Sequence, residues 1–266
     1  MTTLECVRDL AAAQAIREIG VCRWDETRRP VLPCRAASRL PDGARSVIVC
    51  LFPYAFASDA PRNVSRYACV PDYHVAAGAV LDAFAQSLRD AFPAETFEAF
   101  MDNSPVREVA SAVAADLGVR GDNGLLISDA FGSYVFIGCI VTTLSLPATE
   151  ASRECVHCGA CVSACPGGCL PTPSRDTCVS ALTQKKQDWT DEERRLVLDG
   201  GSLWGCDACQ QACPMNADKR KDPHPCFTWY EPQLTASSLD DLTDKAYGWR
   251  GKAVLQRNLA LFETKE

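Results

Sequence analysis

The sequence predicts a mixed α/β (α+β) domain followed by a small domain that binds metal. Segments with helical and strand-like patterns alternate through residues 1–150. From Glu154 onward the composition changes, because nine of the 16 cysteines lie between Glu154 and Pro214, among turn-forming proline and glycine. We therefore predict domains at residues 1–150 and 151–226, and a C-terminal loop and helix at 227–266.

The first predicted elements are two helices and a strand. The opening segment, "MTTLECVRDLAAAQAIREIG", is predicted to be an amphipathic helix that ends at Gly20. "SVIVCLFPY" at 46–54 is typical of a buried strand. Residues 72–92 have helical spacing, and their predicted apolar face consists of Val75, Ala79, Val80, Phe84 and Leu88.

The rest of this domain is predicted as a strand, a helix and a hairpin. "ETFEAFMD" at 95–102 is a strand that leads into a helix, with Ser104 as its cap, Pro105 as its first residue and Gly118 after its end. "GLLIS" and "YVFIGCIVTT" are predicted to pair as a hairpin around "DAFGS".

Composition and charge narrow the functional classes. The formal net charge of −7 argues against a broad nucleic-acid-binding surface, although "KRK" at 219–221 is a local basic patch. Charges throughout the first 20 residues argue against a signal peptide, and the longest apolar run, at 133–147, is too short to span a bilayer. We expect a soluble, cytoplasmic protein with no membrane contact, in which clustered cysteines bind metal.

The first cysteine run, "CVHCGACVSACP", has the spacing of a bacterial ferredoxin. Its thiols are separated by two, two and three residues, and a proline follows the last one. In two-cluster ferredoxins the fourth cysteine of such a run reaches the neighbouring cluster. A pair of zinc sites is the alternative, but zinc motifs usually pair two short knuckles across a longer loop. The spacing therefore favours iron–sulfur clusters.

The second run, "GCDACQQACP", lacks one cysteine of this pattern. Its first two cysteines are predicted ligands of a second cluster, and its last one crosses back to the first cluster. Cys178 in "RDTCVSALT" is the predicted missing ligand. Cys169 is a competitor, but its closeness to Cys165 makes it a poorer geometric fit than Cys178. The two predicted [4Fe-4S] ligand sets are Cys155, Cys158, Cys161 and Cys213, and Cys165, Cys178, Cys206 and Cys209.

Seven segments occur in a characteristic order along the chain: "SRYACVPDYH", "MDNSPVREVA", "FGSYVFIGCIVTT", the first cysteine run, "DTCVSALTQ", "GCDACQQACP" and "WRGKAVLQRN". Together they resemble the epoxyqueuosine reductase family, the cobalamin-dependent iron–sulfur enzymes of the last step of queuosine synthesis in tRNA. The resemblance implies a cobalamin-binding domain like that of the reductive dehalogenases, followed by a bacterial ferredoxin-like double [4Fe-4S] domain. It also implies base-off cobalamin, an external low-potential electron donor, and tRNA or an epoxyqueuosine-containing fragment as substrate.

The resemblance assigns Asp102, in "MDNS", the role of proton donor. Removal of the epoxide oxygen as water takes two electrons and protons, so an acid must lie beside the reacting oxygen. By the residues alone, Asp102 can equally be an acidic residue favoured near a helix N-terminus. The cobalamin contacts that the resemblance implies are Arg35, Ser65, Asp102, Leu126, Ile137, Ser180 and Asp207.

The sequence also departs from the family pattern. His74 nearly completes a D-x-H-x-x-G cobalt-ligand motif, but one residue too many separates it from Gly78, so we expect a structural role for His74. Asp122 stands where the family usually has a lysine, which replaces a positive charge near the pocket with a negative one. The chain ends at Glu266, where the family's C-terminal helical-repeat domain would begin, so a short form is expected.

Three functions fit these observations. The first is reduction of epoxyqueuosine to queuosine in tRNA by a cobalamin-dependent iron–sulfur oxidoreductase. The second keeps these cofactors but reduces a small organic molecule. The third is an electron-transfer or corrinoid-activating protein without a substrate of its own. Asp102 discriminates among them, because a pure electron carrier needs no proton donor.

Overall fold

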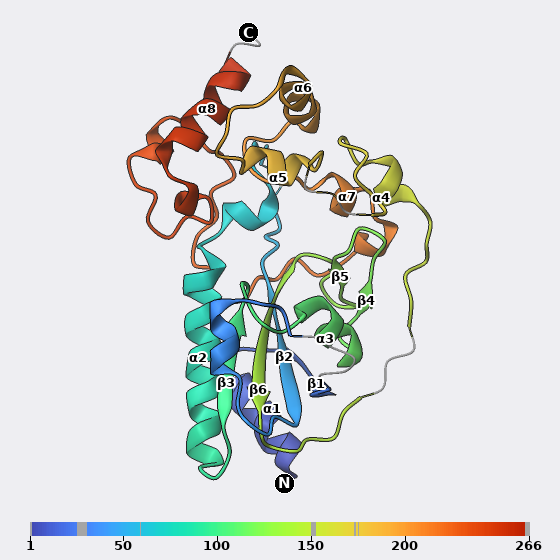
Figure 1. Cartoon of the computed structure of the whole chain (residues 1–266), viewed down its shortest axis with the longest axis vertical. Helices are drawn as coiled ribbons and strands as arrows, with labels where there is room; N and C mark the ends of the chain where they lie inside the picture. The colour runs from blue at the N-terminus through green and yellow to red at the C-terminus, as the bar shows by residue number, and fades with distance from the viewer. Residues whose placement is uncertain are drawn as a thin grey trace.

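The computed structural model describes residues 2–25, 31–58, 60–149, 153–172, 174 and 176–263. Within them, a four-stranded sheet forms the centre of the first half of the chain (Figure 1). The predicted domain boundary at residue 151 and the chain end at Glu266 lie outside the described residues.

The sheet is antiparallel throughout. Its strands, in spatial order, are β1 (Glu18–Arg23), β2 (Ser46–Pro53), β6 (Val135–Thr142) and β3 (Phe97–Met101). The central strand β2 is buried over its whole length, which confirms the buried strand predicted at 46–54. A central strand covered on both faces needs apolar side chains in both directions, and this explains its unbroken apolar run.

Helices cover both faces of the sheet. On one face lie α1 (Thr3–Ala13) and α2 (Tyr73–Ala91), and on the other lies α3 (Glu108–Ala114) (Figure 1). Two separate apolar cores result, one under each helical layer. The predicted mixed class is confirmed, with the helices and antiparallel strands of an α+β domain. None of the helices in the described part of the chain is long and apolar enough to cross a membrane.

The second half of the chain, residues 153–263, contains both cysteine runs and is called the cysteine-rich half. It is built from helices at the upper end of Figure 1. They are α4 (Ala160–Ser163), α5 (Val179–Thr183), α6 (Asp191–Gly200), α7 (Ala208–Gln211) and α8 (Lys252–Glu263). Short 3-10 helices occur in both halves of the chain. In the first half they are η1 (Arg35–Arg39) and η2 (Arg66–Cys69), and in the second half η3 (Pro214–Asn216), η4 (Ser237–Leu239) and η5 (Gly248–Arg250). Helices α4 and α7 contact each other, so the two cysteine runs lie side by side.

The N-terminal helix ends earlier than predicted. It stops at Ala13, and Gly20 lies inside strand β1 rather than at a helix end. A Cβ added at Gly20 would lie 2.3 Å from the backbone oxygen of Ala115. This glycine is therefore explained by the close approach of the segment after α3 to the strand, not by helix termination.

The predicted apolar face of α2 is only partly correct. Phe84 and Leu88 are buried, but Val75 is 57% exposed. The remaining buried residues of the helix are Ala77, Leu81 and Ala85. Apolar residues occupy more of this helix than one face can hold, so the sequence pattern alone did not select the correct stripe.

Helix α3 begins later than predicted. Arg107 precedes its first residue, so Ser104 and Pro105 lie in the preceding turn and not at the helix start. The Ser104 hydroxyl oxygen accepts the backbone N–H of Val106 at 3.0 Å and stabilises that turn. The predicted end is also late, because the helix stops at Ala114, four residues before Gly118.

The predicted hairpin around "DAFGS" does not form as two paired strands. Strand β5 (Leu126–Ile127) pairs with β4 (Val119–Arg120), whereas β6 belongs to the main sheet. Only an isolated bridge between Ser128 and Gly132 closes the turn. The turn residues were identified correctly, but the two segments that flank them join different sheets.

Candidate active site and metal centres

The cysteines of the two runs line two cavities. One small cavity is lined by Cys155, Cys158, Cys161 and Cys213, together with residues that include Gly121 and Asp122. A much larger cavity is lined by Cys165, Cys169, Cys178, Cys206 and Cys209, among others. These groupings contain the two ligand sets predicted from the sequence, and four thiolates around one cavity fit the ligand requirement of a [4Fe-4S] cluster.

The larger cavity holds one thiol more than a cubane needs. The sulfurs of Cys165 and Cys169 are 3.4 Å apart, and Cys178 lies close enough to affect Cys169 electrostatically. Burial raises the pKa of the Cys169 thiol. Geometry therefore leaves both Cys169 and Cys178 beside the second cluster position, and Cys178 as the ligand stays a prediction.

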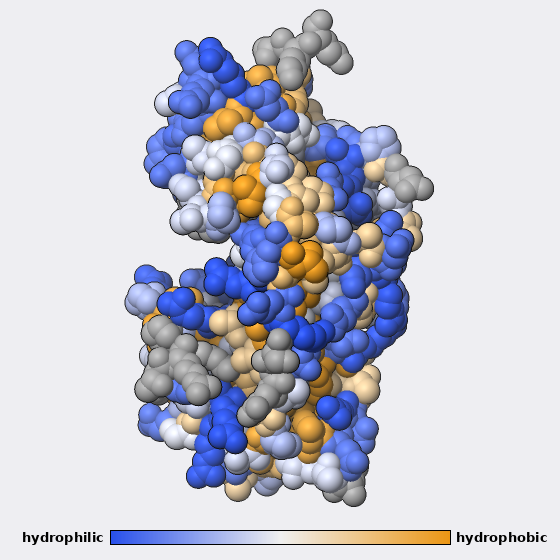
Figure 2. All heavy atoms as spheres, turned by 90° about the vertical axis from the view of Figure 1, so that its right-hand side faces the viewer, coloured by the Kyte–Doolittle hydropathy of each residue, from blue (hydrophilic) through white to orange (hydrophobic). Residues whose placement is uncertain are grey.

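The larger cavity, about 1150 Å³ in volume, lies between the sheet and the cysteine-rich half. Figure 2 shows the molecule hollowed between its upper and lower parts. This volume exceeds the usual range for drug-sized ligands, so the cavity suits a large cofactor with space beside it. Its aromatic lining consists of Tyr54, Tyr67, Tyr73, Phe136 and Trp249.

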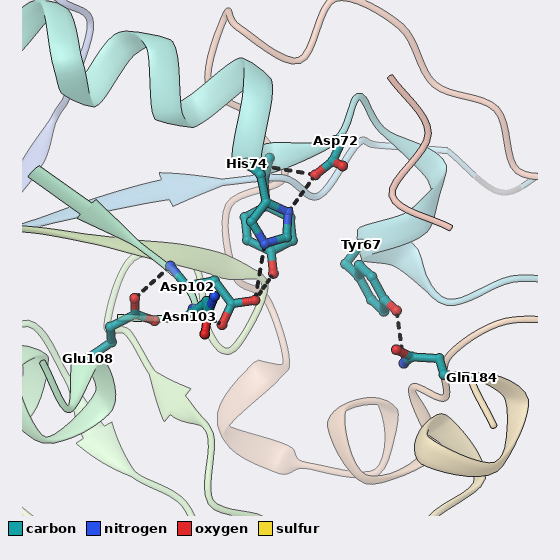
Figure 3. Close-up of polar contacts among 8 residues, drawn as sticks. Tyr67, Asp72, His74, Asp102, Asn103, Glu108 and Gln184 are labelled. Atoms are coloured by element: carbon teal, nitrogen blue, oxygen red, sulfur yellow. Dashed lines mark hydrogen bonds and ion pairs between the residues drawn. The ribbon is translucent and has the colours of Figure 1, made fainter. Parts of the chain in front are cut away.

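Asp102 lies on the wall of this cavity, where strand β3 ends. Asp102 and Asn103 both have positive φ, 49° and 37°, which non-glycine residues seldom adopt. Two hydrogen bonds hold this turn: the Asp102 N–H donates to Glu108 Oε1 at 2.8 Å, and the Asn103 N–H donates to Asp102 Oδ1 at 2.7 Å. The strained turn aims the Asp102 side chain toward the start of α2 (Figure 3).

Two side chains from α2 hold the Asp102 carboxylate. The Tyr73 hydroxyl donates to Oδ2 at 2.6 Å, and His74 Nε2 lies 3.2 Å from the same oxygen (Figure 3). The other ring nitrogen of His74, Nδ1, lies 2.8 Å from Asp72 Oδ1. Asp72 is also the N-cap of α2 and accepts the His74 backbone N–H at 3.0 Å.

These contacts set the charges of the group. The hydrogen bond from His74, aided by that from Tyr73, holds the pKa of Asp102 well below its usual range. Asp102 and Asp72 together raise the pKa of His74 to about 9. At neutral pH the site therefore contains an imidazolium between two carboxylates, and its acidic proton is on His74 rather than on Asp102.

Glu108 behaves in the opposite way. Burial and the nearby negative charge of Asp102 raise the pKa of Glu108 to about 8. Its carboxyl group is therefore largely neutral at pH 7, while Asp102 is ionised. Two carboxyl groups joined through one backbone hydrogen bond thus have widely separated pKa values, an arrangement typical of functional sites.

The other predicted cobalamin contacts are distributed unevenly. Ser180, at the start of α5, lines the large cavity with Asp102. Leu126 and Ile137 belong to the apolar core on the α3 face of the sheet, and Arg35 is exposed in a 3-10 turn. Ser65 is buried and is not among the residues that line the large cavity, and its hydroxyl has no hydrogen-bond partner among the described residues.

Asp207 is buried in an ion pair. Its Oδ2 accepts from Arg62 Nη1 at 2.8 Å and from the Arg66 N–H at 2.8 Å, while Gln210 Nε2 donates to Oδ1 at 3.2 Å. The carboxylate thus joins the segment before η2 to the second cysteine run. These contacts favour a role for Asp207 in fixing the cluster loop against the cavity wall.

Sequence reasoning missed several residues of the site. It treated His74 as structural, although this residue contacts Asp102, and it did not single out Tyr73, Gln184 or Trp249. Gln184 Nε2 donates to the Tyr67 hydroxyl at 3.4 Å across the cavity (Figure 3). A signal for His74 was present, because Asp72 is a good N-cap and orients the first turn of the helix.

Asp122 lies beside the smaller cavity. Its Oδ1 is 2.8 Å from Nδ1 of the exposed His157. Asp122, Cys155 and His157 also bring three potential ligand atoms within 4.8 Å of one another. The negative charge predicted at this position is therefore next to the first cysteine group rather than beside Asp102.

Two family descriptions match parts of the chain. "4Fe-4S double cluster binding domain" matches residues 154–216, which contain both cysteine runs. "Epoxyqueuosine reductase QueG, DUF1730" matches residues 35–103, which contain Asp102 and the start of α2.

Relatives in several bacteria have the same family name. An epoxyqueuosine reductase of Gloeobacter violaceus is 32% identical over 257 residues, covering 90% of this chain and 78% of that protein. One of Listeria monocytogenes is 35% identical over 202 residues, covering 70% of this chain and 53% of that protein. The match thus spans about half the length of the Listeria relative.

Solved structures share the fold. A crystal structure of epoxyqueuosine reductase with a tRNA-Tyr epoxyqueuosine-modified tRNA stem loop has a TM-score of 0.82 and 24% identity, covering 97% of this chain and 80% of that chain. A catabolic reductive dehalogenase has a TM-score of 0.50 and 13% identity, covering 97% of this chain and 36% of that one. The predicted likeness of fold to both groups is confirmed, and the identity and coverage of the Gloeobacter relative show that this chain belongs to the epoxyqueuosine reductase family.

Proposed function

We propose that this protein is a cobalamin-dependent iron–sulfur oxidoreductase that reduces epoxyqueuosine to queuosine in tRNA. The observation that carries this proposal is the large cavity, which has a group of cysteines on one wall and the Asp102 group on the other. Electrons can enter from the first wall and protons from the second. The names of its relatives, epoxyqueuosine reductases, support this substrate.

The residues of the chain fit the proposed cofactors. Two groups of cysteines would hold two [4Fe-4S] clusters, and the cavity beside the second group has room for a corrin ring. Ser180 and Asp102 are polar groups of the cavity lining that such a ring could contact. The bound cofactors would supply low-potential electrons to the substrate.

We further propose that cobalamin binds base-off, without a histidine of the protein on cobalt. The chain has three histidines, and among them only His74 lines the large cavity. Both of its ring nitrogens are engaged by carboxylates, one by Asp72 and the other by Asp102. A nitrogen that already holds a hydrogen bond and a proton is not a metal ligand.

Asp102 is the proposed catalytic acid. Conversion of an epoxide to an alkene and water consumes two electrons and two protons. Asp102 lies on the cavity wall, and its turn is fixed by Glu108, so the carboxyl group is held where an epoxide oxygen can reach it. A pure electron carrier has no use for such a group, which favours the reductase over the third function.

An exposed aromatic residue favours a nucleic-acid substrate. Trp249 lines the cavity yet is 60% exposed, and the Arg250 guanidinium lies 3.8 Å from the centre of its ring. An aromatic face beside a cation is a suitable platform for an unpaired base of an RNA loop. We infer that Trp249 stacks on a base that adjoins the modified nucleotide.

We propose a separate role for each of the three predicted segments of the chain. Residues 1–150 would bind cobalamin and substrate, residues 151–226 would hold the clusters, and residues 227–266 would form one side of the substrate entrance. An external low-potential electron donor would reduce the clusters. The position of Trp249 supports the role of the last segment.

The test is anaerobic reconstitution followed by an assay. The protein should contain close to eight irons per chain, because eight cysteines are placed for two cubanes, and it should bind cobalamin stoichiometrically. With a chemical reductant it should convert epoxyqueuosine in tRNA or in an anticodon stem-loop to queuosine, detected by mass spectrometry. Stoichiometric zinc without iron, or loaded protein that converts no epoxyqueuosine substrate, would reject the proposal and favour a small-molecule reductase.

A further inference from the structure

We propose that His74 is the proton reservoir for Asp102: its Nε2 holds the proton that Asp102 passes to the substrate oxygen, and Asp72 keeps the ring oriented. His74 is thus a positioning residue that acts through Asp102. The inference rests on the proposed function and deepens it, because it identifies the source of the acidic proton.

The geometry is that of a relay. His74 lies between two carboxylates, with Nδ1 2.8 Å from Asp72 and Nε2 3.2 Å from Asp102, and these contacts use both ring nitrogens (Figure 3). Its ring stacks on Tyr73 with centroids 4.1 Å apart, which restricts rotation. A purely structural residue at the start of α2 would need only the backbone contact to Asp72.

The surrounding charges favour a protonated ring. Within α2 and its cap, His74 faces Asp72 and the hydroxyl-bearing Tyr73; from the end of β3 it faces Asp102; and from α3 it senses Glu108. These neighbours raise the pKa of His74 to about 9. At pH 7 the His74 ring is therefore protonated.

The other titratable groups near His74 do not offset the effect of Asp72 and Asp102 on its pKa. Burial raises the pKa of Tyr67, on η2, well above its ordinary value, so this residue stays neutral near pH 7. From the C-terminal segment, Asp244 meets Asp72 through its backbone oxygen, and Lys245 is paired with Glu231. No cation contacts either carboxylate oxygen that His74 uses, among the contacts of the described residues.

The proton balance then closes. Breaking the two C–O bonds of the epoxide releases its oxygen, the two added electrons allow the carbon–carbon double bond to form, and two protons convert the oxygen to water. The first proton moves from His74 Nε2 to Asp102 and from Asp102 to the oxygen. His74 is then neutral, and because its side chain is 45% exposed it regains a proton from water for the second transfer.

The decisive experiment measures the proton on His74 without any substrate. The chain has three histidines, so protein labelled with ¹⁵N-histidine, with oxidised clusters and no cobalamin, gives three pairs of ring-nitrogen signals that single His→Gln variants assign. The His74 signal should titrate near pH 9. Asp102→Asn and Asp72→Asn should each lower this midpoint. The matched control is Asp222→Asn, which removes an exposed ion pair between Asp222 and Arg17 outside the site and should leave the midpoint unchanged. A His74 midpoint near 6.5, or one that Asp102→Asn does not move, would overturn the reservoir.

The second measurement is turnover. His74→Gln should lower kcat on the modified stem-loop by about 10²- to 10⁴-fold with little change in KM. The rate of wild type should fall above pH 9, and this fall should be absent in His74→Gln. If wild type is active and His74→Gln has an equal kcat and the same pH profile, the reservoir is wrong while the proposed function stands. If wild type converts no epoxyqueuosine, both fail.

Discussion

Glu108 Oε1 accepts the backbone N–H of Asp102 at 2.8 Å, so a largely neutral carboxyl group supports the turn that carries the ionised one. The pKa of Glu108 is raised to about 8 from its ordinary value of 4.5. Between these pH values the folded protein binds more protons than the unfolded chain, so stability contributed by neutral Glu108 is lost as pH rises from 4.5 to 8. The support of the Asp102 turn is therefore pH-dependent.

We expect Glu108→Gln to remove this loss. The amide oxygen can still accept the Asp102 N–H but cannot ionise, so the variant should gain in Tm relative to wild type as pH rises from 5 to 8. Anaerobic thermal unfolding of wild type and variant, compared at each pH, measures this. A difference in Tm that stays constant over the range would contradict the assignment of a raised pKa to Glu108.

Asp102→Asn should abolish turnover while both clusters and cobalamin remain bound. The amide has nearly the same shape and can still accept the Asn103 N–H, but it cannot relay a proton. We expect a loss in kcat of at least about 10²-fold. Mass spectrometry of the product, together with iron and cobalamin analysis of the same sample, tests this. Loss of cobalamin in step with activity would instead indicate a binding role.

Cys178→Ala should damage one cluster, and Cys169→Ala should leave both intact. Both thiols line the large cavity, but Cys169 follows Cys165 closely and is already in contact with its sulfur. Iron content should fall from about eight toward four in Cys178→Ala only, because a cubane requires four ligands. EPR of the reduced proteins identifies which cluster is lost. The opposite pattern would transfer the ligand role to Cys169.

Arg62→Ala should destabilise the protein by about 3 kcal/mol. It leaves the Asp207 carboxylate, 4% exposed, without its cationic partner beside the second cysteine run. The matched control is Arg17→Ala, which breaks an exposed ion pair with Asp222 and should cost about 0–1 kcal/mol. Anaerobic unfolding of the three proteins gives the comparison. Equal losses for the two variants would show that the Arg62 pair is not effectively buried.

Trp249→Ala should weaken binding of a modified stem-loop by about 5- to 150-fold, the equivalent of 1–3 kcal/mol of base stacking, whereas Trp249→Phe should retain most of it. Because the chain has a net charge of −7, the affinity for the stem-loop should also depend only weakly on salt concentration. Fluorescence anisotropy at several salt concentrations measures the affinity and its salt dependence. Unchanged affinity in Trp249→Ala would remove the stacking role.

The sequence by itself determined the chemistry of the metal centres and the general class of the fold. Cysteine spacing is a local property, so the order of residues predicts two groups of cluster ligands, and the cysteines of these groups line separate cavities. The choice of Cys178 over Cys169 stays a prediction, because both line the larger cavity. The buried strand β2 was equally clear, because a short apolar run rich in β-branched residues is typical of a strand covered on both faces. The helix ends predicted at Gly20 and Gly118 were wrong, because these glycines allow close packing of neighbouring backbone and do not end helices.

Only the tertiary structure decided how the group around Asp102 is charged. Asp102 follows strand β3 and His74 lies in the first turn of helix α2, 28 positions apart in the chain, and no periodicity relates them. Their pairing arises because the turn after β3, held at positive φ, directs Asp102 toward the capped first turn of α2. pKa values depend on such contacts in space, so the sequence could nominate Asp102 as an acid but could not predict the contact with His74 that lowers its pKa.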